Sequence, residues 1–149
     1  MCYFIAAFIL FLDQVSKLCI QNYILQGSSI PIIRDIFHLT LVHNTGAAFG
    51  MLGRHSYLFI IVSIFAIAVI NYFLLQKDRI LNAVEKVALC FIMGGTLGNL
   101  IDRVRLGYVV DFLDFRIWPV FNLADSFITI GAFMLAWAIL RAARVKRVG

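Results

Sequence analysis

Apolar residues gather in four long stretches along the chain. The stretches are residues about 1–25, 57–75, 84–101 and 120–140. Each is close to the roughly 20 residues that a helix needs to cross the hydrocarbon core of a bilayer. In the second stretch, Ser63 and Asn71 are the only polar interruptions. The pattern therefore predicts a mainly α integral membrane protein with four transmembrane helices, built as one membrane-embedded domain over residues 1–149.

A second pattern, with a period of two, occurs between the first and second stretches. Within residues 30–50, one face of the segment would carry Phe37, Leu39 and Leu41, and the other His38, Thr40 and Val42. This alternation is typical of a short strand. The strand leads into Gly46 and Gly50, which allow a turn or a close approach of the backbone to a ligand. We expect a small extracytoplasmic β-platform above the helices.

The composition agrees with a membrane protein. The chain is 62% hydrophobic and only 14% charged, with a mean hydropathy of +0.94. A soluble domain of 149 residues would expose far more charge. The formal net charge is +5, but the basic residues do not form a stripe with interleaved aromatic residues. Charges at the ends of spans explain the basic balance better, so no nucleic-acid partner is predicted.

The basic residues also predict the orientation in the membrane. Seven of them fall on one side of a four-span arrangement, namely Lys77, Arg79, Lys86, Arg141, Arg144, Lys146 and Arg147. The positive-inside rule makes that side cytoplasmic. Both termini are then inside, and residues 27–56 and 105–121 lie outside. The first stretch lacks a basic leader and a small-x-small cleavage site, so we interpret it as a spanning helix.

Neither the cysteines nor the histidines are spaced as metal ligands are. Cys2, Cys19 and Cys90 lie in apolar stretches without a Cys-x-x-Cys or Cys/His pattern, so we expect them to be buried small hydrophobic residues. The histidines are equally scattered, at His38, His43 and His55. No metal is predicted.

The third apolar stretch combines small residues with a polar group. Gly94 and Gly98 are four residues apart, with Gly95 between them, which is typical of close helix–helix packing. A polar group follows within about one helical turn, and it consists of Asn99, Asp102 and Arg103. These side chains could cap and pair at the membrane interface, or they could orient a substrate.

Two aspartates flank the entry to the last apolar stretch. Asp111 and Asp125 are fourteen residues apart in similar apolar surroundings. A carboxylate beside hydrocarbon is costly, and two of them suggest a paired acid/base site. Taken singly, Asp111 could be a solvated loop residue and Asp125 a helix N-terminal residue favoured by the dipole. Asp114 is interpreted as interfacial, and Asn44 alone could form an Asn-x-Gly turn.

The polar residues in or near the spans all map to the outer half of the membrane. They are Asp13, Lys17, Asn44, Asn99, Asp102, Arg103, Asp111, Asn122 and Asp125. From these residues alone an enzyme, a small proton-coupled transporter and a structural membrane subunit all remain open. The connection over residues 107–119 looks irregular and rich in aromatic residues, which favours a site that admits a peptide over a sealed ion path.

Five ordered motifs make a family resemblance specific. They are Asp13-Gln14-x-x-Lys17, Asn44-x-Gly46-Ala47-Ala48-Phe49, Gly98-Asn99-Leu100-Ile101-Asp102-Arg103, Val109-Val110-Asp111-Phe112 and Phe121-Asn122-x-Ala124-Asp125. Their order and their spread over almost the whole chain are similar to those of the lipoprotein signal peptidases, the type II signal peptidases of bacteria.

The resemblance implies a multi-pass aspartyl protease of the bacterial cytoplasmic (inner) membrane, with its active site toward the outer face. It implies removal of the signal peptide from prolipoproteins, before a cysteine that carries a diacylglyceryl group, by the catalytic pair Asp111 and Asp125. It implies substrate binding by Asn44, Gly46, Asn99, Arg103 and Asn122, and positioning by Asp13, Lys17 and Asp102. We expect membrane lipid as a partner, no cofactor and a monomer.

Overall fold

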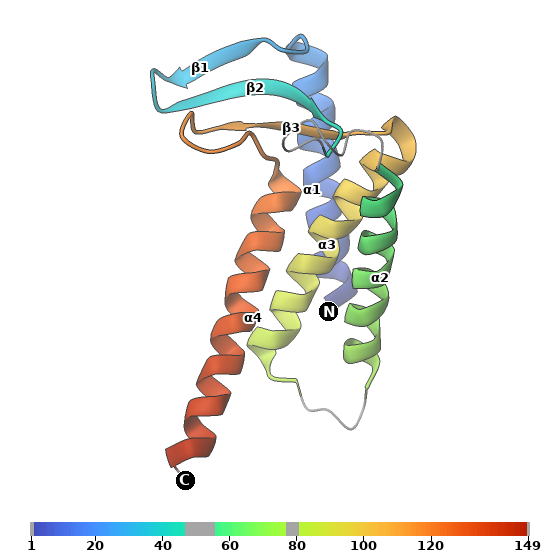
Figure 1. Cartoon of the computed structure of the whole chain (residues 1–149), viewed down its shortest axis with the longest axis vertical. Helices are drawn as coiled ribbons and strands as arrows, with labels where there is room; N and C mark the ends of the chain where they lie inside the picture. Colours follow the sequence, from blue (N-terminus) through green and yellow to red (C-terminus); the bar gives the residue numbers. More distant parts are fainter. Residues whose placement is uncertain (1, 47–55, 77–80, 149) are drawn as a thin grey trace.

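The chain folds into a helical bundle with a small sheet at one end (Figure 1). The computed structural model describes residues 2–46, 56–76 and 81–148. In chain order the elements are α1 (Cys2–Tyr23), β1 (Ser29–Ile33), β2 (Phe37–Asn44), α2 (Ser56–Leu75), α3 (Ala83–Leu106), β3 (Val109–Asp114) and α4 (Leu123–Val148). The sheet lies across one end of the bundle, and the start of α1 and the end of α4 point away from it. The expected fold class, four long helices with a small β-platform, is confirmed.

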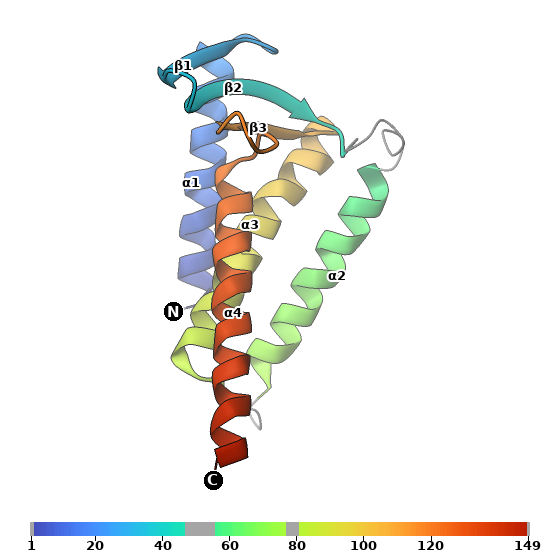
Figure 2. The ribbon, with the colours of Figure 1, turned by 60° about the vertical axis from the view of Figure 1, so that its left-hand side comes forward.

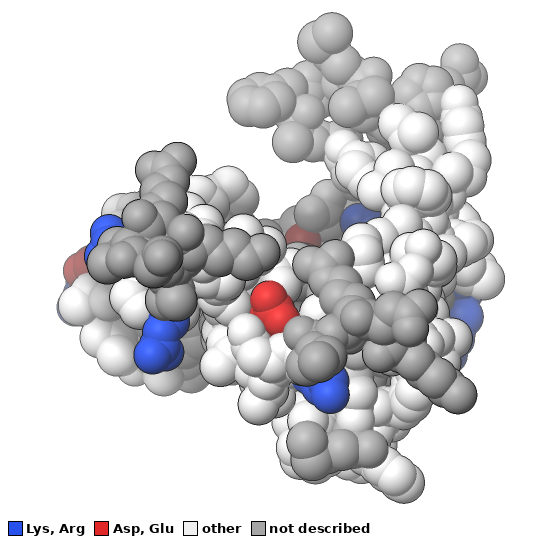
Figure 3. Space-filling model, turned by 90° about the horizontal axis from the view of Figure 1, so that it is seen from below, with Lys and Arg blue, Asp and Glu red and all other residues white. Residues whose placement is uncertain are grey.

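All four helices are long and apolar enough to cross a membrane. Their outer surfaces carry large exposed hydrophobic side chains such as Phe4, Phe65 and Phe133. In water these side chains would be unfavourable, whereas lipid tails accommodate them. Seen from the end away from the sheet, the described surface is mostly neither basic nor acidic, with separate charged patches (Figure 3).

Two of the helices extend beyond their predicted ends. The apolar pattern ends the third span at Ile101, but α3 continues to Leu106. Gly107 then adopts a left-handed conformation (φ 82°), and its N–H donates to the carbonyl of Arg103. Similarly, α4 continues to Val148 instead of ending near Leu140. Hydropathy reports where a helix leaves the hydrocarbon, whereas capping and pairing decide where it ends.

Helix α3 is the central helix, and glycines bring its neighbours close. A methyl group on Gly94 would lie 2.8 Å from the backbone oxygen of Ala6 in α1. A methyl group on Gly95 would collide with the backbone oxygen of Ala124 in α4. The predicted packing through small residues is therefore confirmed. Helix α2 is inclined to the others, and its end nearest the sheet lies apart from α4 (Figure 2).

The sheet has the order β1-β2-β3, with antiparallel neighbours. Strand β2 confirms the strand predicted from the period-two pattern. The connection over residues 107–119 was expected to be irregular, and this expectation is wrong, because it contains β3. Strand β3 is a run of buried residues, and Val109 and Val110 are almost inaccessible. Such a run does not alternate, so only its pairing with β2 defines it as a strand.

The cysteines differ from the prediction. Cys2 and Cys90 form a disulfide that ties the start of α1 to α3. Cys19 is exposed on α1. Only Cys90 is fully buried, so the expectation of three buried small hydrophobic residues is wrong for the other two. The pairing joins positions 88 residues apart, and no local pattern in the sequence signals it.

Candidate active site

Strand β3 places Asp111 at the edge of the bundle, opposite Val42 of β2. The side chain is 1% exposed. Asn44 Nδ2 donates to Asp111 Oδ2 at 2.8 Å, and Asn122 Nδ2 donates to Asp111 Oδ1 at 2.7 Å. Each carboxylate oxygen therefore accepts a hydrogen bond from a different amide. Asp111 is not the solvated loop residue that its sequence position alone allows.

The amide of Asn44 has only one orientation that suits its neighbours. Its Oδ1 accepts the N–H of Gly46 at 2.9 Å. Because that N–H needs an acceptor, the Nδ2 group must be the one that faces Asp111. Gly46 itself has φ 83°, and a side chain there would collide with the ring of Phe59. The Asn-x-Gly turn and the contact with Asp111 are thus two parts of one arrangement.

The first turn of α4 holds Asp125. Asn122 Oδ1 accepts the Asp125 N–H at 2.8 Å, and the Asn122 N–H donates back to Asp125 Oδ2 at 3.4 Å. This reciprocal capping places Asp125 at the positive end of the helix. Asn99 Nδ2 of α3 donates to the other oxygen, Oδ1, at 2.7 Å. Asp125 is therefore a capping residue and also part of the polar cluster.

Asn122 joins the two aspartates. It is fully buried, and its Nδ2 group contacts Asp111 Oδ1 at 2.7 Å, Asn99 Oδ1 at 3.0 Å and the Val110 carbonyl at 3.3 Å. Its Oδ1 is already used to cap α4 at Asp125. One side chain therefore sets the position of Asp111 relative to Asp125.

A buried lysine supports this arrangement from α1. Lys17 Nζ lies 2.8 Å from Asp13 Oδ2, 2.8 Å from Asp102 Oδ2 and 3.0 Å from Asn99 Oδ1. These contacts use all three ammonium protons. The Asn99 oxygen then accepts from both Lys17 and Asn122, which leaves the Asn99 N–H group for Asp125. Lys17 therefore fixes which way the Asn99 amide points.

The carboxylates that hold Lys17 also bind backbone of neighbouring elements. Asp13 Oδ1 accepts the Ala124 N–H at the start of α4, at 3.0 Å. Asp102 Oδ2 accepts the Val110 N–H of β3 at 3.1 Å. Gln14 Nε2 donates to Asp102 Oδ1 at 3.0 Å. Gln14 belongs to the first of the five motifs, but no role was predicted for it from the sequence. Its position next to Asp13 could have indicated that it is part of the site.

Burial sets the protonation of Asp111. The pKa of Asp111 is raised from 3.8 to about 7, mainly by burial and in part by the nearby charge of Asp125. The hydrogen bonds from Asn44 and Asn122 and the charge of Lys17 act in the opposite direction. A carboxyl group with this pKa can carry a proton near neutral pH and release it within a reaction.

Arg103 lies at the end of α3 beside the same group. Its guanidinium stacks over the ring of Phe59, 5.1 Å from the ring centroid. Its charge interacts with the carboxylates of Asp125 and Asp111. The side chain is half-buried. Arg103 thus places a fixed positive charge near both aspartates.

Asp114 belongs to the sheet and not to the aspartate pair. It is 4% exposed, and its carboxylate accepts hydrogen bonds from Thr40 Oγ1 at 2.7 Å and Arg116 Nη1 at 2.9 Å. Burial raises its pKa, but these bonds prevail and hold the pKa below its ordinary value. Asp114 is therefore a buried residue that links β3 to β2, and its position at the membrane interface stays a prediction.

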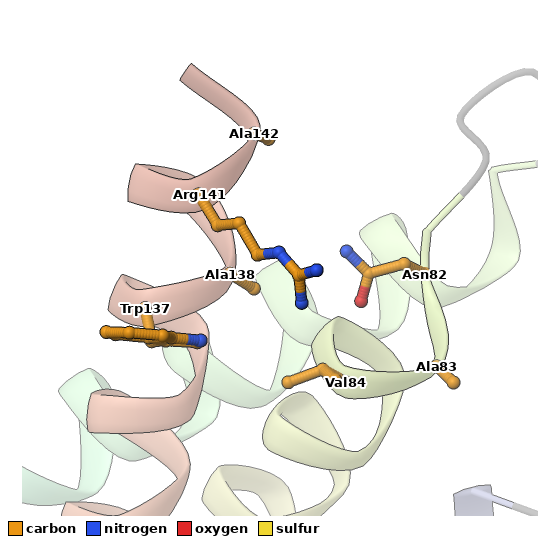
Figure 4. Close-up of a pocket in the computed structure, with 7 residues that line it drawn as sticks. All are labelled: Asn82, Ala83, Val84, Trp137, Ala138, Arg141 and Ala142. Atoms are coloured by element: carbon orange, nitrogen blue, oxygen red, sulfur yellow. The ribbon is translucent and has the colours of Figure 1, made fainter. Parts of the chain in front are cut away.

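Two cavities differ in the chemistry of the residues that line them. One, of about 390 Å³, is lined by Phe115, Trp118, Phe121, Asp125, Ser126, Thr129 and Ile130. The other, of about 600 Å³, lies between the start of α3 and α4 at the opposite end of the bundle. There Arg141 extends from α4 toward Asn82 (Figure 4), and among the described residues that line this cavity it is the only ionisable one. These described residues therefore supply no acid/base pair to the larger cavity.

The structure brings all ten predicted site residues into one connected region. They are Asp13, Lys17, Asn44, Gly46, Asn99, Asp102, Arg103, Asp111, Asn122 and Asp125. The motif residues Ala47, Ala48 and Phe49 lie outside the described residues. Within the described residues, no three His, Cys, Asp or Glu side chains are grouped so that they could hold a metal ion.

Comparisons with known proteins agree with this geometry. The family described as Signal peptidase (SPase) II matches residues 5–141. The lipoprotein signal peptidase of Pelotomaculum thermopropionicum is 49% identical over 93% of this chain and 90% of its own length. That of Clostridioides difficile is 47% identical over 87% of each chain. A bacterial membrane enzyme structure, obtained by the in meso method at 2.3 Å resolution, superposes with a TM-score of 0.87 at 36% identity, over 95% of this chain and 88% of the other.

These findings support an aspartic-type signal peptidase, and none of them supports the proton-coupled transporter. The match includes every motif on which the resemblance was based, from Asp13 to Asp125. The chain belongs to the signal peptidase II family.

Proposed function

We propose that this single peptidase domain removes the signal peptide from prolipoproteins by cleaving before a diacylglyceryl cysteine, with Asp111 and Asp125 as the catalytic pair. The observation that carries the assignment is the link between the two aspartates through the buried Asn122, whose Nδ2 donates to the Asp111 carboxylate and whose Oδ1 accepts the backbone N–H of Asp125. Family membership supports the reaction. The amides and charges around the two carboxylates support the roles of the residues.

Hydrolysis of a peptide bond requires an activated water and a proton for the carbonyl oxygen. Because the pKa of Asp111 is raised to about 7, Asp111 is suited to hold the proton that the pair shares. In this proposal Asp111 donates its hydrogen bond to the carbonyl oxygen, and Asp125 takes a proton from the attacking water. Asp125 then gives this proton to the nitrogen of the leaving amine as the C–N bond breaks, which releases the carboxylic acid and the amine. All of these steps use side chains of the chain itself.

The neighbouring residues would have two kinds of role. Asn44 is exposed, and Arg103 is half-buried, so both can reach a bound peptide, together with Gly46. Asn99 and Asn122 are buried, and they hold the carboxylates in place while they border the substrate. The remaining residues would act only by positioning the others, because they are buried beneath Asn99. These residues are Asp13, Lys17 and Asp102.

The orientation is part of the proposal. With the basic residues inside, both termini face the cytoplasm, and the sheet and the aspartates lie at the outer face of the cytoplasmic membrane. Single cysteines introduced at Ser28 and Arg144, in a background without the native cysteines, test this arrangement. A membrane-impermeant thiol reagent applied to intact cells should label Ser28→Cys and not Arg144→Cys. The opposite pattern, or labelling of both positions, would overturn the orientation. We expect the enzyme to act as a monomer.

The catalytic pair is tested by single-turnover cleavage of a lipidated prolipoprotein with purified protein in detergent. Asp111→Asn and Asp125→Asn should each lower the rate by at least about 10³-fold, and the double variant should be little worse, because residues that act as a unit are not additive. Asp114→Asn is the matched control, since it removes another buried carboxylate from the same strand and should leave cleavage largely intact. Substantial cleavage by a folded Asp111→Asn or Asp125→Asn protein would remove that aspartate from the mechanism.

A further inference from the structure

The smaller cavity begins at Asp125 and leads away from the aspartate pair. The connection between β3 and α4, which crosses the end of α4 nearest the sheet (Figure 1), forms its roof. The roof residues are Phe115, Trp118 and Phe121, and the wall residues on α4 are Ser126, Thr129 and Ile130. We call this cavity the α4 groove. Its described lining is mostly apolar, and its polar groups are the Asp125 carboxylate, the hydroxyls of Ser126 and Thr129 and the indole N–H of Trp118.

The α4 groove leads to the lipid-facing surface of the bundle. Thr129 and Ile130 lie about one turn beyond Asp125, away from the sheet, and both are exposed. Ile130 is 48% exposed, and Phe133, at 74%, continues the same apolar surface of α4. A group bound at Asp125 can therefore extend along the groove into the bilayer without crossing a polar region.

Several polar backbone groups along this cavity are already paired. The Phe121 N–H donates to the Leu113 carbonyl, and the Phe121 carbonyl accepts from the N–H groups of Phe112 and Leu113. The hydroxyl of Ser126 donates to the Asn122 carbonyl at 3.0 Å, and α4 satisfies its own backbone. An extended peptide would lose its hydration here and find few partners, whereas a hydrocarbon chain needs none.

We propose that the α4 groove receives the first part of an acyl chain of the diacylglyceryl group on the substrate cysteine. This proposal rests on the proposed function. In that reaction the modified cysteine directly follows the scissile bond, so its lipid is attached only a few bonds from the carbonyl that is attacked by the water next to Asp125. The volume of about 390 Å³ is in the range of small-molecule sites, and it suits part of one chain rather than a whole diacylglyceryl group.

The groove contributes position more than affinity. An acyl chain that enters it leaves one apolar environment, the bilayer, for another, so little hydrophobic free energy is gained. A chain held between Trp118 and Ile130 would instead fix the distance from the lipidated cysteine to Asp125. That alignment brings the scissile carbonyl to the aspartates, and it keeps the carbonyl of a neighbouring peptide bond away from them.

Photo-crosslinking tests where the lipid lies. A lipidated prolipoprotein is prepared with a diazirine on an early methylene of one acyl chain, and is bound to the Asp111→Asn protein so that it stays uncut. A second substrate carries the diazirine on the residue before the cysteine. We expect the acyl probe to label residues 115–121 and 126–130, and the peptide probe to label other residues. Labelling of α1 or α2 by the acyl probe, or of the groove by the peptide probe, would overturn the proposal.

Filling the groove tests its contribution to turnover. Ile130→Trp and Thr129→Phe should each lower kcat/KM at least about tenfold with an unchanged melting temperature, because the added ring occupies the space of the acyl chain. Leu18→Trp is the matched control, since Leu18 on α1 is also exposed, at 51%, in the half of its helix nearest the sheet. Normal kinetics in both groove variants would refute the proposal. The proposed function would still be supported in that case, because the wild-type protein cleaves the substrate. A wild-type protein that does not cleave would refute the proposed function itself.

Discussion

The raised pKa of Asp111 predicts that this proposed catalytic residue destabilises the fold at neutral pH. In the unfolded chain the carboxyl ionises near its ordinary pKa of 3.8, whereas in the folded protein burial raises the pKa to about 7. Below pH 3.8 both states are protonated, and Asp111 has no effect on stability. Between these two values the folded protein keeps a proton that the unfolded chain has lost. The free energy of unfolding therefore falls as the pH rises, and it levels off above about pH 7.

The size of this effect follows from the gap between the two pKa values. At 1.36 kcal/mol per pKa unit, the gap between 3.8 and about 7 corresponds to about 4 kcal/mol. Asp111→Asn removes the titration, but it also places an N–H₂ group against the amide of Asn44 or Asn122, which costs about 1–3 kcal/mol. That cost does not depend on pH. The informative quantity is therefore the difference in pH dependence, and not the stability at one pH.

Denaturant unfolding in detergent, from about pH 4 to about pH 8, measures this difference. Wild type should lose about 4 kcal/mol relative to Asp111→Asn across this interval. Asp114→Asn is a control of opposite sign, because the lowered pKa of Asp114 stabilises the fold once the pH is above its ordinary value. Parallel curves for wild type and Asp111→Asn would show that the folded protein does not hold a proton on Asp111. The proposed role of Asp111 as the acid would then be wrong.

Three further substitutions test the support of the site. Lys17→Met leaves the carboxylates of Asp13 and Asp102 buried without their cation, and we expect denaturant unfolding to show a loss of about 3–5 kcal/mol. A loss below about 1 kcal/mol would mean that these carboxylates are protonated or hydrated. Gly95→Ala forces α3 away from the α4 backbone, and calorimetry should show a lower melting temperature, equivalent to about 1–3 kcal/mol. Arg103→Lys keeps the charge but loses the planar group over the aromatic ring, so turnover should fall about tenfold at unchanged stability, and wild-type kinetics would reduce Arg103 to an interfacial anchor.

Local signals in the sequence were sufficient for most of the fold. The four spans follow from runs of apolar residues, and β2 follows from alternation over six residues. Strand β3 and the last turns of α3 were missed for a common reason. Both are defined by partners distant in the sequence, since Asp102 is buried against Lys17 and also binds the Val110 N–H at the start of β3. No window of neighbouring residues contains that information.

The composition of the site was predictable, but its internal connections were not. The motifs predicted that Asn44, Asn99 and Asn122 lie near the substrate, and the structure shows that each donates a hydrogen bond to a carboxylate. An amide can point either way, so its orientation depends on every neighbour at once. The sequence likewise indicated an aromatic connection after β3, without showing that Trp118 and Phe121 roof a groove that begins at Asp125.

The amide groups that donate to the two aspartates are held in place by different neighbours. Lys17 donates to the Oδ1 of Asn99, and the Nδ2 of Asn99 donates to Asp125, so a buried cation supports the donor to Asp125. Asp111 receives only neutral amides, and one of these, on Asn44, is fixed by a backbone turn. Burial favours the proton on Asp111, whereas the charge of Lys17 and the hydrogen bonds from the amides act against it. The two carboxylates are thus held by different sets of donors before a substrate arrives. This is how a preorganised site avoids reorganisation during the reaction.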